Sequence, residues 1–182
     1  MEDILDRNLR GMTEAVRRNE ITSVDLVQGF LDRIEKVNSS LNAVVSINTE
    51  IALKLAAKAD SDLKEGIVHG PLHGIPMTIK DSLDTKDMVT TWGTKGRETF
   101  RPGRDATSVA RLRDAGAILL GKTNTPEFTL SFQTDNLVYG RTNNPYNLEM
   151  TPGGSSGGAA ALIAANAIPF DIGTDTGGSI RL

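Results

Sequence analysis

Short apolar runs, separated by segments of helix length, place the strongest limit on how this chain folds. Residues 76–79, 117–120 and 168–172 are runs with the length and composition of buried strands, and residues 43–47 are a fourth, β-branched candidate. Because the segments between the later runs are long enough for crossover helices, the pattern predicts an α/β fold. We expect a mixed, mainly parallel sheet flanked by helices, with Lys80 at the carboxyl end of the strand at residues 76–79.

Helix signals fill the segments between these runs. Thr22 and Asp25 have the spacing of a capping box, and the helix that they open carries an apolar stripe at spacings of three and four (Leu26, Val27, Phe30, Leu31, Ile34 and Val37). Further helices are expected over residues 51–65 before Gly66, after a cap at Asp105 and up to Gly116, after a cap at Thr125, and over residues 159–165.

Composition excludes several classes of function. The 182 residues suffice for one domain or a large piece of one. A net charge of −3 argues against nucleic-acid binding and against a basic membrane-surface helix. No apolar run is long enough to cross a bilayer, and the N-terminus lacks a signal-peptide core, so a cytoplasmic protein is expected. The absence of cysteine excludes disulfides, thiolate nucleophiles and cysteine-based metal sites.

Three motif matches lack the context that their chemistry needs. Residues 116–123 fit the phosphate-loop pattern, but the residues between the two glycines are themselves a strand candidate. Residues 154–158 fit the nucleophile-elbow pattern around Ser156, but a polar segment with two prolines precedes them and both histidines come earlier in the chain. His69 and His73 have the spacing of helical zinc ligands, but the glycines and proline around them disfavour a helix, so the rings are not expected to share a face.

One lysine and two glycine-serine segments remain, and their chemistry fits together. Paired glycines in residues 151–158 and 173–181 let backbone N–H groups approach a ligand closely, and a serine at a helix start lies in a positive field. A serine nucleophile needs a base, and with no cysteine and no well-placed histidine the base available is Lys80. Burial lowers the pKa of a lysine by several units, toward the neutral form that a base requires.

These segments resemble the amidase-signature family. The matching stretches are GIPMTIKD at residues 74–81, GKTN at 121–124, PGGSSGG at 152–158 and DTGGSIR at 175–181, in family order. The resemblance implies the amidase-signature fold and the hydrolysis of a carboxylic acid amide to the acid and ammonia or an amine. It implies a Ser–cis-Ser–Lys triad in which Ser179 is the nucleophile, Ser155 the bridging serine on a cis peptide and Lys80 the base.

The resemblance also assigns supporting roles. The backbone N–H groups of Thr176, Gly177, Gly178 and Ser179 are expected to form the oxyanion hole. Ser156, Asp175 and Arg181 are expected to support the site, although Arg181 fits either a contact with a substrate carboxylate or a brace within the fold. The expected ligand is a small-molecule amide, with no metal, no cofactor, no direct nucleic-acid contact and no membrane contact.

Further alternatives stay open at this point. Family members usually carry a domain more than twice this long, so residues 1–182 are expected to be the N-terminal part of a single truncated domain. The triad also occurs in the A subunit of tRNA-dependent amidotransferases, which hydrolyses glutamine. Residues 123–128 favour a general amidase, since an acidic or Met-containing stretch is expected there in the amidotransferase. Another possibility is an inactive remnant, and the sequence does not specify the amide or the oligomeric state.

Overall fold

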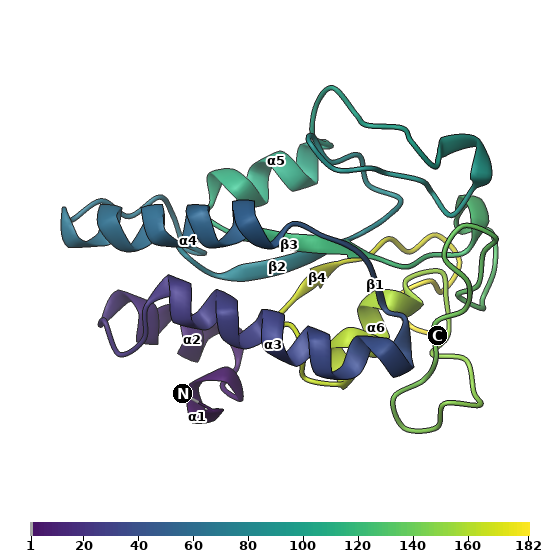
Figure 1. Ribbon diagram of the computed structural model, residues 1–182, viewed down its shortest axis with the longest axis horizontal. Helices are drawn as coiled ribbons and strands as arrows, with labels where there is room; N and C mark the ends of the chain where they lie inside the picture. Colours follow the sequence, from purple (N-terminus) through teal and green to yellow (C-terminus); the bar gives the residue numbers. More distant parts are fainter. Residues whose placement is uncertain (1) are drawn as a thin grey trace.

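The computed structural model describes residues 2–182 and contains one four-stranded sheet in the order β1-β3-β2-β4 (Figure 1). The strands are β1 (Val44–Ile47), β2 (Pro76–Lys80), β3 (Ile118–Thr123) and β4 (Asp171–Ile172). β2 pairs in parallel with β3 and with β4, whereas β1 pairs antiparallel with β3. The predicted mixed, mainly parallel α/β sheet is therefore confirmed.

Helices cover both faces of this sheet (Figure 1). Within the described residues they are α1 (Glu2–Leu5), α2 (Leu9–Arg17), α3 (Ser23–Leu41), α4 (Thr49–Lys64), α5 (Thr107–Asp114) and α6 (Gly157–Ala164). α5 lies on one side of the sheet, and α3 and α6 lie on the other, while α4 packs against α3 and β3. Within residues 2–182, none of these helices combines the length and the apolar character needed to cross a membrane.

Alternation along β3 divides the core between the two faces. Ile118 and Leu120 join the larger apolar cluster with the buried stripe of α3, whereas Leu119 joins a smaller cluster with Val109 of α5. Successive side chains of a strand point to opposite faces, so this division follows from the sequence. Both central strands are buried at every position, which accounts for the apolar runs at residues 76–79 and 118–120, although both strands end in buried polar residues.

The predicted start of the long helix is confirmed, although the Asp25 carboxylate accepts from the Thr22 hydroxyl at 2.7 Å and not from the Thr22 N–H of a full capping box. The Thr22 hydroxyl oxygen accepts a hydrogen bond from the backbone N–H of Asp25 at 3.0 Å, so Thr22 caps α3. Five of the six predicted stripe residues are buried, and Val37 packs against the same cluster while partly exposed.

Two predicted helix caps are wrong because other segments bind the side chains. Asp105 accepts a hydrogen bond from the backbone N–H of Lys86 at 2.7 Å, and the N-cap residue of α5 is Ala106, whose side chain makes no capping bond. The Thr125 hydroxyl donates to the carbonyl of Ser155, and only a 3₁₀ turn, Glu127–Thr129, follows it.

Strand bounds also differ from those expected. β4 covers two residues of the predicted range 168–172, because Pro169 has no N–H to donate to the ladder and Ile168 packs into the core instead. β3 continues three residues beyond the predicted run, through Gly121, Lys122 and Thr123. Ser179 was expected to open a helix, but the residues around it form a single turn closed by bonds from Arg181 and Leu182 to the carbonyl of Gly178.

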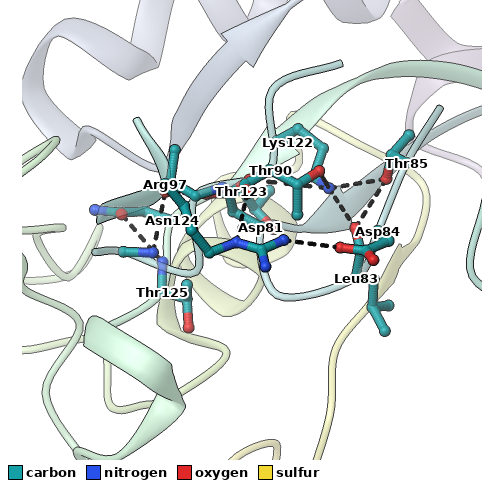
Figure 2. Close-up of polar contacts among 12 residues, drawn as sticks. Asp81, Leu83, Asp84, Thr85, Thr90, Arg97, Lys122, Thr123, Asn124 and Thr125 are labelled. Carbon is teal, nitrogen blue, oxygen red and sulfur yellow. Dashed lines mark hydrogen bonds and ion pairs between the residues drawn. The ribbon is translucent and has the colours of Figure 1, made fainter. Parts of the chain in front are cut away.

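β3 continues because Lys122 finds oxygen partners in the interior. Its amine, fully buried, donates to the carbonyl of Leu83 at 2.6 Å and to the hydroxyls of Thr85 and Thr90 at 2.8 and 3.2 Å (Figure 2). The carboxylate of Asp81 lies 3.8 Å from the same amine. Lys122 thereby holds the segment that leaves β2 against the end of β3.

Replacing Lys122 with methionine tests this role. Methionine has an uncharged side chain of similar length, so the substitution leaves a buried carboxylate and three oxygen acceptors without their cation. We expect Lys122→Met to lower the free energy of unfolding by about 3–5 kcal/mol, measured by denaturant titration. Lys36→Met, at an exposed position of α3, is the matched control and should change it by less than about 0.5 kcal/mol. Equal stability of the two variants would show that the Lys122 contacts contribute nothing to folding.

Candidate active site

The amine of Lys80 is buried at the carboxyl end of β2 and is surrounded by hydroxyl groups. Its Nζ lies 2.6 Å from the Oγ of Ser155, 3.0 Å from the Oγ of Ser156 and 3.0 Å from the Oγ1 of Thr174. The side chain of Lys80 has no exposed surface. β2 thus places the Lys80 amine where the two glycine-serine segments, residues 151–158 and 173–181, meet.

Burial decides the electrostatics of this amine. Removal from water lowers the pKa of Lys80 to about 8, and the carboxylates of Asp171 and Asp175 oppose that shift. A lysine with this pKa is neutral in about one molecule in ten at pH 7. The site therefore supplies an amine that accepts a proton near neutral pH.

The segment at residues 151–158 presents Ser155 and Ser156 to the lysine. The peptide bond between Gly154 and Ser155 is cis, as the resemblance implies. The carbonyl of Ser155 accepts a hydrogen bond from the hydroxyl of Thr125 at 3.0 Å. Ser156 is the N-cap residue of α6, and its hydroxyl donates to the carbonyl of Thr174 at 3.1 Å. Both serines are therefore fixed from two sides.

Asp175 organises the turn that carries Ser179. Its carboxylate accepts hydrogen bonds from the backbone N–H groups of Gly178 at 2.7 Å and Ile180 at 3.1 Å. The guanidinium of Arg181 binds both oxygens of the same carboxylate, at 2.9 and 3.0 Å. These bonds hold the pKa of Asp175 well below its ordinary value, with the Arg181 contact as the largest cause. The paired geometry favours the bracing role of Arg181 over a contact with substrate.

The N–H groups assigned to the oxyanion hole fall into two groups. Gly178 donates to Asp175, so its N–H is not available to a ligand in this arrangement. The backbone N–H groups of Thr176, Gly177 and Ser179 make no hydrogen bond to any residue in the range 2–182. Three backbone donors of this turn therefore have no acceptor within the described residues.

Ser179 contacts the neighbouring segment of the site through its backbone carbonyl. Its carbonyl accepts a hydrogen bond from the N–H of Ser156 at 3.0 Å, which joins the turn to the start of α6. Within the described part of the chain no hydrogen bond joins the Ser179 hydroxyl to Ser155 or Lys80. The structure thus brings Lys80 and Ser155 into contact, and joins the backbone of Ser179 to that of Ser156.

Two residues at this site had no role in the sequence analysis. Thr174 contacts Lys80 and Ser156, and Asp171 accepts hydrogen bonds from Thr78 at 2.6 Å and from Thr123 at 2.9 Å. A carboxylate inside an otherwise apolar strand candidate was a signal for Asp171. Thr174 gave none, because its role depends on which segments meet there.

The two histidines lie elsewhere, and their predicted separation is wrong. Although residues 69–73 are not helical, the rings of His69 and His73 stack with centroids 5.5 Å apart. His69 contacts the carboxylate of Asp62 at 2.6 Å, and His73 contacts the carbonyl of Ala59 at 3.0 Å. Both line a cavity of about 460 Å³ between α4 and α5, which none of Lys80, Ser155 and Ser179 lines. Among residues 2–182 no three potential metal ligands cluster.

Curated relatives match this chain along nearly its whole length. The glutamyl-tRNA(Gln) amidotransferase A subunit of Acidothermus cellulolyticus is 41% identical over 181 residues, which is 100% of this chain and 36% of the relative. The protein of the same name from Coxiella burnetii is 46% identical over 175 residues, or 96% of this chain and 36% of the relative. The chain thus spans little more than a third of the length of these relatives.

Solved structures show the same fold. A fatty acid amide hydrolase superposes with a TM-score of 0.95 at 29% identity, covering 99% of this chain and 32% of that one. The peptide amidase from Stenotrophomonas maltophilia superposes with a TM-score of 0.88 at 38% identity, covering 96% and 37%. The sheet and the glycine-serine segments therefore belong to an amidase-signature fold.

The sequence model of the family named Amidase matches residues 25–182. Together with the relatives, this match shows that the chain belongs to the amidase (amidase-signature) family.

The role of Asp175 in the turn predicts a local effect of its removal. We expect Asp175→Ala to speed hydrogen exchange of the Gly178 and Ile180 amides by about tenfold, because both lose a charged acceptor. Amides of α3, which has no hydrogen bond to Asp175 within residues 2–182, should keep their rates. Asp135→Ala, which removes an exposed acid, is the control. Unchanged exchange at both amides would contradict the assigned role of Asp175.

Proposed function

We propose that the protein hydrolyses a carboxylic acid amide through an acyl-enzyme on Ser179, with Lys80 as the base and Ser155 as the bridge. The observation that carries this proposal is the 2.6 Å contact between the Lys80 amine and the Ser155 hydroxyl, both of which belong to buried residues. Membership of the family supports the same chemistry. The proposal uses only groups of this chain.

The first half of the reaction forms the acyl-enzyme. Ser179 Oγ attacks the amide carbonyl carbon, its proton passes to Ser155 Oγ, and the Ser155 proton passes to the neutral amine of Lys80. The carbonyl oxygen becomes an oxyanion, which the open N–H groups of the turn bind. The proton then returns through Ser155 to the leaving nitrogen, the C–N bond breaks, and ammonia or an amine departs.

The second half repeats the proton path with water. Water attacks the ester carbonyl, giving its proton to Lys80 through the Ser155 hydroxyl, and the bond to Ser179 Oγ breaks. Ser179 recovers its proton and the carboxylic acid leaves. Because the same groups act in both halves, the pKa of Lys80 controls both.

Covalent labelling tests this proposal without requiring turnover. We expect a fluorophosphonate to label Ser179 in the folded chain, with the site mapped by peptide mass spectrometry. Below pH 8 the labelling rate should rise about tenfold per pH unit, because the fraction of neutral Lys80 rises about tenfold per pH unit there. Above pH 8 most Lys80 amines are neutral, so the labelling rate should level off.

Matched variants show whether the label depends on the proposed groups. Ser179→Ala should remove the label, and Lys80→Met should slow it by several orders of magnitude, while Ser61→Ala and Lys36→Met at exposed positions should leave it unchanged. Circular dichroism checks that each variant is folded. A labelling rate in Lys80→Met near that of the parent chain rejects lysine as the base.

A second candidate is glutamine hydrolysis, as in the A subunit of a tRNA-dependent amidotransferase. The 41–46% identity to proteins of that name favours it about as well as a general amidase. These matches offset the preference for a general amidase that residues 123–128 gave. In this case the amide of glutamine is the substrate, and the ammonia passes to a partner.

Ammonia release separates the two candidates. The chain is incubated with L-glutamine, with propionamide and with benzamide, and ammonia is measured by an enzymatic assay against the Ser179→Ala variant. For a general amidase we expect release from the simple amides and none from glutamine. Release from glutamine alone would replace the first candidate with the second.

A further inference from the structure

We propose that Asp171 is a positioning residue that supplies the buried counter-charge for Lys80, and thereby sets the pH at which Lys80 becomes a proton acceptor. This inference rests on the proposed role of Lys80 as the base. Asp171 acts on the amine and not on the substrate. It carries no role in the triad or in the turn of Ser179.

Strand pairing brings Asp171 to the same face of the sheet as Lys80. Asp171 pairs with Thr78 across β4 and β2, and Thr78 precedes Lys80 by two positions on β2. Residues two apart on a strand share a face. Thr123 is the register partner of Lys80 on β3, so all four residues gather where three parallel strands end.

One oxygen of the carboxylate is held by hydrogen bonds and the other has no partner. Oδ2 accepts both threonine hydroxyls, from Thr78 at 2.6 Å and from Thr123 at 2.9 Å. Oδ1 is buried and makes no hydrogen bond within residues 2–182. Burying a carboxylate with only one hydrogen-bonded oxygen costs folding free energy unless a cation lies near it. The threonines thus hold a negative charge beside the lysine without occupying its amine.

The Lys80 amine forms its hydrogen bonds with hydroxyl groups and not with the Asp171 carboxylate. Lys80 Nζ is bonded to the hydroxyls of Ser155, Ser156 and Thr174, and none of the described ion pairs joins it to a carboxylate. Asp171 therefore acts through its field. A direct ion pair would instead take one of the amine's protons away from the bridging serine.

Few other charges act on this pair. The carboxylates that act on Lys80 are Asp171 and Asp175, and the cations that act on Asp171 are Lys122 and Lys80. Asp175 is bound to Arg181, and Lys122 lies beside Asp81. α6, which packs on β2 and β4, has no ionisable side chain. Asp171 is thus the one carboxylate near Lys80, within the described chain, that has no ion-pair partner of its own.

The pKa values of Asp171 and Lys80 are in the order that a counter-charge requires. Burial raises the pKa of Asp171 to about 6, against the threonine bonds and the two lysines. The pKa of Lys80 is about 8, and Asp171 is the largest influence that holds it up. Between these values the carboxylate is negative and the amine positive, and above pH 8 the amine is neutral. Removing the negative charge should therefore lower the pKa of Lys80.

The test is Asp171→Asn, which preserves shape and can still accept both threonine hydroxyls. The ε-carbon resonance of ¹³C-labelled Lys80, assigned with Lys80→Met, is followed against pH in the parent chain and in the variant. We expect the midpoint for Lys80 to fall by about one pH unit in Asp171→Asn. Asp32→Asn, which removes an exposed acid of α3, is the control for net charge and should leave the midpoint unchanged. An unchanged midpoint in folded Asp171→Asn overturns the proposal.

A measurement on the parent chain covers the case in which the variant does not fold. The Lys80 resonance should show a second, smaller step near pH 6, at the midpoint of the Asp171 carboxyl resonance, because ionisation of one group changes the field at the other. Absence of that step overturns the proposal. Both readouts are independent of Ser179 chemistry. A midpoint shift without fluorophosphonate labelling would reject the proposed hydrolysis and keep the coupling of Asp171 to Lys80.

Discussion

Burying a lysine amine at the end of β2 is the constraint on which the rest of this structure depends. A charged ammonium loses its hydration there, and that cost lowers the pKa of Lys80 to about 8. The cost is acceptable only because three hydroxyls contact the amine, and those hydroxyls come from two segments distant in the chain. The glycines of both segments allow that approach. A Cβ on Gly158, for example, would meet the backbone of Asn124 and Ala43.

The buried polar groups form two separate layers around β2. On the face of α6, Lys80, Thr78 and Asp171 combine with the two serines. Toward the segment that follows β2, Lys122 and its oxygen partners hold that segment in place (Figure 2). The second layer contacts no proposed reacting atom, and its effect is to fix where β2 ends. The position of Lys80 therefore depends on interactions on both faces of the sheet.

The sequence predicted what local pattern determines. Continuous apolar runs identified the central strands, the capping box identified α3, and the end of the run at residues 76–79 placed Lys80 correctly. Prediction from the sequence failed where contacts between distant segments determine the local structure. Asp105 and Thr125 are good caps by residue type, but the backbone of Lys86 and the carbonyl of Ser155 bind them first. The extension of β3 through Lys122 required knowledge of oxygen partners from another segment. The oxyanion donors came from the family resemblance, and the bond from Gly178 to Asp175 was not foreseeable from spacing.

The central claim is that a proton passes between Ser179 and Lys80 through Ser155, and a crystal structure of the fluorophosphonate-treated chain tests it most directly. Our account predicts phosphorus bonded to Ser179 Oγ, with Ser155 Oγ within hydrogen-bond distance of both that oxygen and the Lys80 amine. It also predicts a phosphoryl oxygen bound by the N–H groups of the turn. An adduct on another residue, or a Ser155 hydroxyl in contact with only one of the two groups, would contradict it.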